Sequence, residues 1–313
     1  MNSRIRGNIM ISLSKCKNKD KILNINKQQN TAVGRYYDKI FIPRSFENII
    51  LRHVILNSLN YSCYKPAPLL FLQGRKGEGK SFMTETILKG NNIVYRFISS
   101  SVLTGKREGE AVENLMLYYN MCEMNPAAGK YTALVIDDFH LSIAITKCNA
   151  GHTTNADNLL EALMNIADRK VPLKAPIILI GNDFTEAYPP LTRAGRANIC
   201  TWEPSLEDKK EIVRNLIKQQ SVGSSEITDE QINHLVETYR DQYIGFFEKA
   251  IGNAYFDEME QVTNFFAESK GQVDSTHLSA LIAKTLETKR LSITEIERQA
   301  QEIILSKPQK LDY

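Results

Sequence analysis

Gly74-Arg75-Lys76-Gly77-Glu78-Gly79-Lys80-Ser81 is the stretch of sequence that decides the fold. It follows a short apolar run, residues 68–72, which predicts a buried strand, and it precedes residues 82–88, whose apolar side chains recur at helical spacing. A strand, a turn of the pattern G-x-x-x-x-G-K-S and a helix together form a P-loop. The glycines let the backbone turn tightly and direct its N–H groups at phosphate oxygens. The sequence therefore predicts a phosphate-binding loop.

The P-loop supplies most of the predicted ligand contacts. Lys80 can reach the β- and γ-phosphates of a nucleotide, and the Ser81 hydroxyl can join the coordination shell of Mg²⁺. The helix that begins here adds the positive end of its dipole. ATP and Mg²⁺ are the predicted ligands. The predicted nucleotide contacts are Gly74, Lys76, Gly77, Glu78, Gly79, Lys80, Ser81 and Phe82.

A second acidic motif follows about 50 residues later in the chain. Residues 132–138 read as a buried strand that ends in Asp137 and Asp138. We expect Asp137 to hold the metal, together with Ser81, and Asp138 to polarise the attacking water. The second position is usually glutamate in ATPases of this kind. An aspartate is shorter, so it must lie nearer to the water or act through a second water, which favours slower turnover.

Three further polar residues complete the predicted catalytic set. Asn182 stands at the end of another apolar run, residues 176–183, where it can orient the same water or contact the γ-phosphate. Arg193 and Arg196 follow Pro189-Pro190. Two arginines placed after this strand are suited to act as an arginine finger on the nucleotide of a neighbouring subunit. Such an arginine stabilises the charge that develops on the γ-phosphate. A turn-forming role for Asn182 and a structural ion pair for either arginine are the simpler alternatives.

Strands and helices alternate through the first two thirds of the chain. Strands are expected at residues 68–72, 93–98, 132–138 and 176–183, and helices at 46–56, 82–88, 110–121 and 156–167. Because each strand is apolar throughout, the pattern predicts an α/β fold with a parallel sheet flanked by helices. Ligands bind at the carboxyl ends of such strands, where the polar residues fall.

After Pro204 the pattern is helical only. Three sequences that resemble capping boxes, at residues 205–208, 228–231 and 292–295, predict helix starts, and residues 246–255 carry one apolar face. We therefore expect three parts: a basic arm over residues 1–37, an α/β nucleotide-binding domain over 38–203, and a helical lid with a tail over 204–313.

Composition limits the class of protein and its partners. The chain has 313 residues, 42% of them apolar and 24% charged, which is ordinary for a globular protein. Its longest apolar run is far short of the roughly 18 residues that a membrane span needs, so no membrane association is expected. Five cysteines without a C-x-x-C pair argue against a zinc site or a disulfide framework, and they favour a reducing compartment such as the cytoplasm.

The charge is concentrated at the amino terminus. Residues 1–39 carry nine Lys or Arg and two Asp, a net charge of +7 in a chain whose total is +3. A solvated, disordered tail is the simplest interpretation of this arm. Contact with nucleic acid or an acidic partner, and an address to the chloroplast stroma, are the alternatives. The arm lacks the acid-poor, Ser- and Arg-rich composition of a good transit peptide.

The order of the motifs resembles that of AAA+ ATPases, and the residues between them resemble Rubisco activase, particularly its cyanobacterial form. The resemblance covers about residues 38–300. It is carried by residues 74–82, Met164-Asn165-Ile166-Ala167-Asp168, Gly181-Asn182-Asp183-Phe184, and Arg193-Ala194-Gly195-Arg196 leading to Trp202-Glu203-Pro204. The family implies a homo-oligomeric ring, usually a hexamer, that uses ATP hydrolysis to release inhibitory sugar phosphates from Rubisco.

The chain departs from that family where the family grips its client. Leu103–Gly109 and residues 141–152 match the two pore-loop positions, but both differ in sequence from the pore loops of the family. The lid reads Lys249-Ala250-Ile251-Gly252-Asn253 where the family has the run that supplies its sensor-2 arginine. The resemblance makes Rubisco the first hypothesis for the client, and these departures leave other clients open. A non-Rubisco client, associated with nucleic acid through the arm and the Lys106-Arg107 loop, is the second. A nucleotide-dependent assembly module with little hydrolysis is the third.

Overall fold

The computed structural model describes residues 34–59, 65–103, 107–139, 154–184, 189–220, 227–256, 260–268, 274, 276, 279–280 and 291–306. Most of the predicted basic arm, residues 104–106 of the first pore-loop position and residues 140–153, which hold the second, lie outside the described residues. The domain boundary that the sequence places after residue 203 falls between the last strand of the sheet and the first lid helix.

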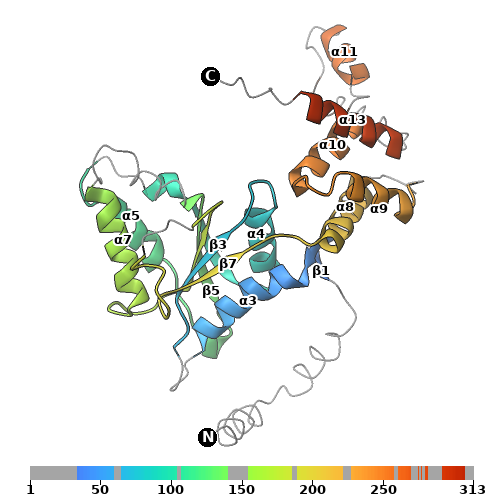
Figure 1. Cartoon of the computed structure of the whole chain (residues 1–313). Coiled ribbons are helices and arrows are strands. Elements are labelled where there is room, and N and C mark those ends of the chain that lie inside the picture. Colours follow the sequence, from blue (N-terminus) through green and yellow to red (C-terminus); the bar gives the residue numbers. More distant parts are fainter. Residues whose placement is uncertain are drawn as a thin grey trace, which may run out of the picture.

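A five-stranded parallel sheet forms the centre of the α/β domain (Figure 1). Its order is β4-β5-β6-β3-β7, so β3, which leads into the P-loop, has a neighbour on each side. The strands are β3 (Leu69–Gln73), β4 (Val94–Ser99), β5 (Thr132–Asp137), β6 (Ile177–Ile180) and β7 (Ala197–Thr201). The predicted class of fold is confirmed, and all five strands present their carboxyl ends at one edge.

Two helices cover each face of the sheet, because the side chains of every central strand alternate between the faces. Leu70 and Leu72 of β3 pack with α3 (Arg44–Ser58) and α4 (Lys80–Gly90). Leu69 and Phe71 pack on the other face with α5 (Glu110–Asn120) and α7 (Thr154–Ala167), which lie together beyond the sheet in Figure 1. Short 3-10 turns, η2 (Ser100–Leu103) and η3 (Pro126–Ala128), complete the domain.

An antiparallel hairpin precedes the domain's first helix. β1 (Gly34–Tyr37) pairs with β2 (Ile40–Pro43), and the two-residue turn uses Asp38 and Lys39 at positive φ, as the twist of a tight hairpin requires. Tyr37 and Phe41 are buried. The hairpin begins inside the stretch that we assigned to the arm and was not expected, because four-residue strands with a mixed polar pattern give little periodic signal.

Strand β7 is the second element that the sequence did not predict. Only Ala197 of this strand is fully buried, and Asn198 and Ile199 are exposed, because β7 pairs with β3 alone at the edge of the sheet. Continuous apolar runs mark strands that are covered on both faces. An edge strand with polar residues escapes that criterion.

The lid is helical, as expected. Its helices are α8 (Leu206–Gln220), α9 (Asp229–Thr238), α10 (Ile244–Phe256), α11 (Glu260–Glu268) and α13 (Ile293–Leu305). The three predicted starts are confirmed: Asp208 N–H donates to Ser205 Oγ, Thr228 and Gln231 form a reciprocal capping box, and Glu295 N–H donates to Ser292 Oγ. Helices α8, α9, α10 and α13 share one apolar core.

The lid meets the α/β domain through a small apolar cluster of Phe41 from the hairpin, Ile212 from α8 and Ile244 from α10. Trp202, in the connection between the two domains, is buried and packs edge-on against Phe46 of α3, with ring centroids 4.8 Å apart. It is a packing residue at the domain boundary. Within the described part of the chain, no helix combines the length and apolar character that a membrane crossing requires.

Candidate active site

The P-loop turns sharply between β3 and α4. Gly74 has φ +152°, and a Cβ atom there would lie 2.3 Å from the carbonyl oxygen of Trp202, so only glycine fits. Its N–H donates to the carbonyl of Asn182, at 3.1 Å, which fixes the loop to the end of β6. Helix α4 starts at Lys80 and places its first turn at the carboxyl edge of the sheet. The local geometry therefore follows the sequence prediction.

Lys80 is buried at the centre of the loop. Its Nζ donates to the carbonyl oxygens of Gly74, at 2.7 Å, and Arg75, at 2.9 Å. Burial lowers the pKa of Lys80, and the carboxylates of Glu78, Asp137 and Asp138 oppose that effect. The ammonium is thus held at the mouth of the loop by carbonyls that it can exchange for phosphate oxygens.

Ser81 and Asp137 meet at this edge from different elements. Ser81 Oγ donates to Asp137 Oδ1 at 2.8 Å, which joins the start of α4 to the end of β5. Asp138 has φ +54°, a left-handed conformation that aspartate tolerates, and its N–H donates to Asp137 Oδ1 at 3.0 Å. Strand β5 therefore ends in a turn at the acidic pair, and both carboxylates border one cavity.

That cavity has a volume of about 250 Å³. The predicted residues Lys76, Gly77, Gly79, Lys80, Ser81, Phe82, Asp137, Asp138 and Asn182 line it, together with Ile180 and Gly181. Every lining residue comes from the α/β domain. Two predicted nucleotide contacts, Gly74 and Glu78, are not among them. The N–H of Gly74 donates to Asn182, and the side chain of Glu78 is buried against the lid.

The donor set fits a magnesium ion that is shared with a nucleotide. Among the residues that the structure describes, no cluster of three or more His, Cys, Asp or Glu side chains could hold a metal by itself. Mg²⁺ usually takes one or two protein ligands, with waters and substrate phosphates completing its octahedron. The hydroxyl of Ser81 and the carboxylate of Asp137, 2.8 Å apart, are of this kind.

A second cavity, of about 310 Å³, adjoins the first and shares Gly77, Gly79 and Phe82 with it. Most of its lining is apolar and comes from the hairpin, α4, α8 and α10: Ile40, Phe41, Met83, Ile212, Leu216 and Ile244. Asn215 accepts from Phe41 N–H at 2.9 Å and donates to the carbonyl of Lys39 at 2.7 Å. This cavity has the size and polarity for the base of a nucleotide. Sequence reasoning missed it because its walls come from four separate elements.

The two predicted arginine fingers lie in different environments. Arg196 forms a bidentate ion pair with Asp168, at 2.6 and 2.7 Å, and also donates to the carbonyl of Pro190. The guanidinium of Arg196 lowers the pKa of Asp168. Arg193 is exposed, and its side chain makes no hydrogen bond or ion pair with another described residue. The structure therefore gives Arg196 a partner within its own chain, and Arg193 is the freer of the two.

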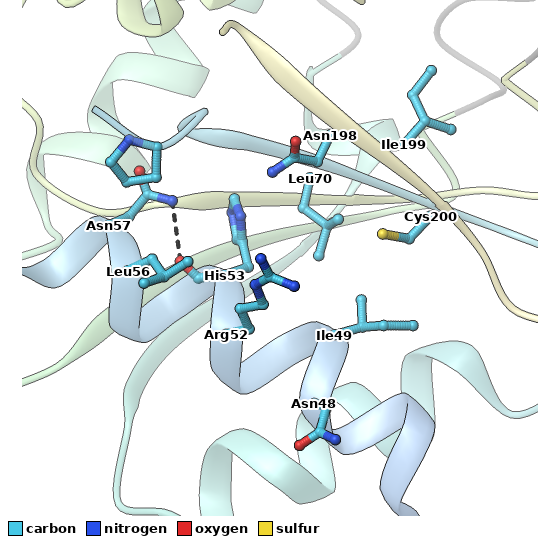
Figure 2. A pocket seen from close by; sticks show the side chains of 11 residues that line it. Asn48, Ile49, Arg52, His53, Leu56, Asn57, Leu70, Asn198, Ile199 and Cys200 are labelled. Carbon is cyan, nitrogen blue, oxygen red and sulfur yellow. Dashed lines mark hydrogen bonds between the residues drawn. The ribbon is translucent and has the colours of Figure 1, made fainter. Parts of the chain in front are cut away.

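A separate groove, of about 410 Å³, lies between α3 and the edge strand β7 (Figure 2). Arg52, His53 and Asn57 of α3 and Asn198 and Cys200 of β7 border it. His53 is 5% exposed, and neither ring nitrogen makes a well-formed hydrogen bond to any described residue. Burial lowers the pKa of His53 to about 4, against a smaller opposing effect of the backbone at Ile177 and Pro68. The histidine is therefore a neutral core residue at physiological pH.

His53 should make the protein less stable in acid. Between pH 6.5 and about 4 the unfolded chain binds a proton at this position and the native chain does not, so stability falls as the pH falls. The full effect is up to about 3 kcal/mol. We expect His53→Gln to remove it, as measured by urea unfolding at pH 7.5, 5.5 and 4.5. His234→Gln, at an exposed histidine, is the control. An unchanged pH profile in His53→Gln would contradict this assignment.

The chain is similar in sequence to a known family of ATPases and to several characterised proteins. Residues 70–204 match the model of the ATPase family associated with various cellular activities (AAA). The chain is 30% identical over 218 residues to ribulose bisphosphate carboxylase/oxygenase activase of Nostoc sp., an alignment that covers 66% of this chain and 51% of the relative. It is 28% identical over 258 residues to the activase of Anabaena sp., covering 78% and 59%, and 28% identical over 236 residues to the chloroplastic activase of Spinacia oleracea, covering 72% and 49%. The chain spans about half the length of these relatives.

Proposed function

We propose that this chain, a Rubisco activase-like AAA+ protein, binds ATP with Mg²⁺ and hydrolyses it to remodel a protein client, with Rubisco as that client. One observation carries the ATPase part of the proposal. The P-loop residues Lys80 and Ser81, the acidic pair Asp137 and Asp138, and Asn182 line one cavity at the carboxyl edge of the sheet. Cation, metal ligands, water-activating carboxylate and amide are the groups that phosphoryl transfer to water requires.

Each of these side chains has a defined task in the proposed reaction. Lys80 neutralises charge on the β- and γ-phosphates, and Ser81 and Asp137 hold the metal. Bound Mg²⁺ would supply electrostatic stabilisation of the phosphates. Asp138 accepts a proton from, or orients, the attacking water, and Asn182 holds that water in line. The apolar cavity beside Phe41 and Asn215 receives the base, so that the nucleotide lies between the α/β domain and the lid.

The proposed assembly is a homo-oligomeric ring, hexameric as the resemblance to activases implies. Arg193 supports it, because an exposed arginine after the β6 strand can reach outside its own chain. Arg193 then stabilises the γ-phosphate that a neighbouring subunit binds. We propose the cytoplasm as the site of action, or the chloroplast stroma if residues 1–37 act as a targeting segment, as the chloroplastic relatives make reasonable.

Hydrolysis is tested by steady-state ATPase measurements on the wild type and Asp138→Ala. We expect the variant to retain ATP binding and to lose about 100-fold or more in turnover, because general-base catalysis contributes about 10²–10⁴-fold. Asp157→Ala, which removes an exposed carboxylate outside the site, is the matched control and should keep full turnover. Equal, negligible rates in the wild type and Asp138→Ala would instead support an assembly module that binds nucleotide without hydrolysing it.

The client is tested on Rubisco inhibited by a tightly bound sugar phosphate. We expect the wild type to accelerate release of the inhibitor with ATP and to leave it unchanged with a non-hydrolysable ATP analogue. Asp138→Ala should behave with ATP as the wild type does with the analogue. If the wild type hydrolyses ATP but release is the same with ATP and the analogue, Rubisco is not the client and the ATPase assignment stands.

A further inference from the structure

The loop between α9 and α10 rests directly on the P-loop. Gly245 N–H donates to the carbonyl of Gly77 at 2.9 Å, and Arg75 Nη1 donates to the carbonyl of Asp241 at 3.0 Å. Gly77 has φ +85°, and a Cβ atom there would lie 2.4 Å from the ring of Tyr243. The first turn of α10 and the phosphate-binding loop are therefore in backbone contact, which leaves no room for a side chain between them.

Glu78 is the side chain that fills the centre of this contact. It is 2% exposed, and its Oε2 accepts from Ile244 N–H at 3.2 Å. Ile244 is the first residue of α10, so its N–H is one of the amides that a helix leaves without an internal partner. A carboxylate at this end of a helix also complements the helix dipole. Glu78 thus acts as a cap for a lid helix although it belongs to the P-loop.

Two neighbours strengthen the same junction. Lys209 of α8 is buried, and its Nζ donates to the carbonyls of Arg240 and Gln242, each at 2.8 Å, which holds the loop before α10 in place. Trp202 Nε1 donates to the backbone carbonyl of Glu78 at 3.0 Å. Burial raises the pKa of Glu78, and the Ile244 N–H, Lys209, Arg75 and Lys80 oppose that effect. Three lid or linker elements therefore converge on one P-loop residue.

We infer that Glu78 is a positioning residue that couples the lid to the nucleotide. The lid borders the cavity proposed for the base but contributes no described side chain to the cavity that holds the phosphates, so the contact between the P-loop and α10 is the route by which the phosphates act on it. Phosphate binding selects one conformation of residues 75–79, and the carboxylate of Glu78 transmits that conformation to the amino end of α10. This inference rests on the proposed nucleotide binding, and it assigns the coupling to a residue whose neighbours in the loop face the phosphates.

Hydrogen exchange at the amides of Ile244 and Gly245 tests the contact without nucleotide. We expect exchange of a peptide spanning residues 240–246 to be about tenfold or more faster in Glu78→Ala than in the wild type. Glu78→Gln keeps an acceptor oxygen and should restore most of the protection. Glu85→Ala, at an exposed glutamate of α4, is the control, and the helix over residues 154–167 is the internal reference for intact folding. Wild-type exchange rates in Glu78→Ala, or no recovery in Glu78→Gln, would overturn the inference.

The coupling is tested by repeating the exchange with a non-hydrolysable ATP analogue. In the wild type, the analogue should slow exchange of residues 240–246 by about threefold or more, and Glu78→Ala should bind the analogue without this change. Binding in every variant is followed by the fluorescence of Trp202, the single tryptophan, whose Nε1 donates to the P-loop carbonyl of Glu78. A wild type that does not bind the analogue contradicts the proposed function, and with it the coupling. Binding with equal protection of the segment in wild type and Glu78→Ala contradicts the coupling alone.

Discussion

Lys80→Met should lose ATP turnover by about 100-fold or more and weaken ATP binding strongly. Lys80 is the only P-loop side chain whose cation is held inside the turn, with Nζ 2.7 Å from the carbonyl oxygen of Gly74 and 2.9 Å from that of Arg75. A methionine fills the same volume and removes the charge that opposes the phosphates. Steady-state ATPase assays and titration of Trp202 fluorescence with ATP measure the two effects separately.

The matched control for this substitution is Lys89→Met. Lys89 lies in the last turn of the same helix, α4, and is exposed, so its loss should leave turnover within about twofold of the wild type. Lys80→Met should also unfold at a temperature close to that of the wild type, because it replaces a buried cation by an apolar group. Turnover of Lys80→Met within tenfold of the wild type would show that the nucleotide binds elsewhere.

The parts of the fold that the sequence predicts are those with local causes. Strands such as Thr132–Asp137 are covered on both faces, so they appear as continuous apolar runs. The caps at Ser205, Thr228 and Ser292 bind amides only three residues away. Edge strand β7 and the hairpin before α3 have neither kind of signal, so the sequence does not predict them.

In the candidate site, too, the sequence predicts the residues with local causes and misses those that depend on tertiary contacts. The P-loop and the acidic pair are defined by spacing, and parallel topology then brings them to one edge of the sheet. The base cavity depends on Asn215 meeting Phe41, 174 residues earlier in the chain, and the role of Glu78 depends on a contact with Ile244, 166 residues later. Neither pairing leaves a periodic pattern, because the partners are joined by tertiary packing alone.

The arginine pair shows how the structure sharpens a motif. Sequence spacing treats Arg193 and Arg196 alike, but Arg196 is held by Asp168 within its own chain. We expect Arg196→Ala to lower stability by about 1 kcal/mol, because a bidentate surface pair contributes little more. Asp168 has a lowered pKa in the native state, so this stabilising effect is present at neutral pH and is lost as the pH falls below the usual value of about 3.9.

Arg193→Ala should lower ATP turnover by about 10³-fold and leave ATP affinity and thermal stability unchanged. An arginine finger stabilises charge that develops in the transition state, so its loss appears in kcat. The side chain is exposed and makes no hydrogen bond or ion pair with a described residue that its removal would break. Steady-state kinetics, Trp202 titration and thermal unfolding on Arg193→Ala and Arg196→Ala compare the two arginines directly.

Mixing two inactive variants tests whether Arg193 acts on a neighbouring subunit. Arg193→Ala keeps an intact P-loop, and Lys80→Met keeps an intact Arg193. In randomly mixed rings with equal amounts of each, about a quarter of the interfaces combine the two intact halves, so about a quarter of wild-type turnover should return. The comparison is Arg196→Ala mixed with Lys80→Met. Because Arg196 is not expected to act on a neighbouring subunit, turnover should come only from the subunits that keep an intact Lys80. Absence of rescue, with each variant shown to assemble, would mean that Arg193 does not complete a site in trans, and the cavity at Asp137 and Asp138 would then have to supply all of the charge stabilisation from one chain.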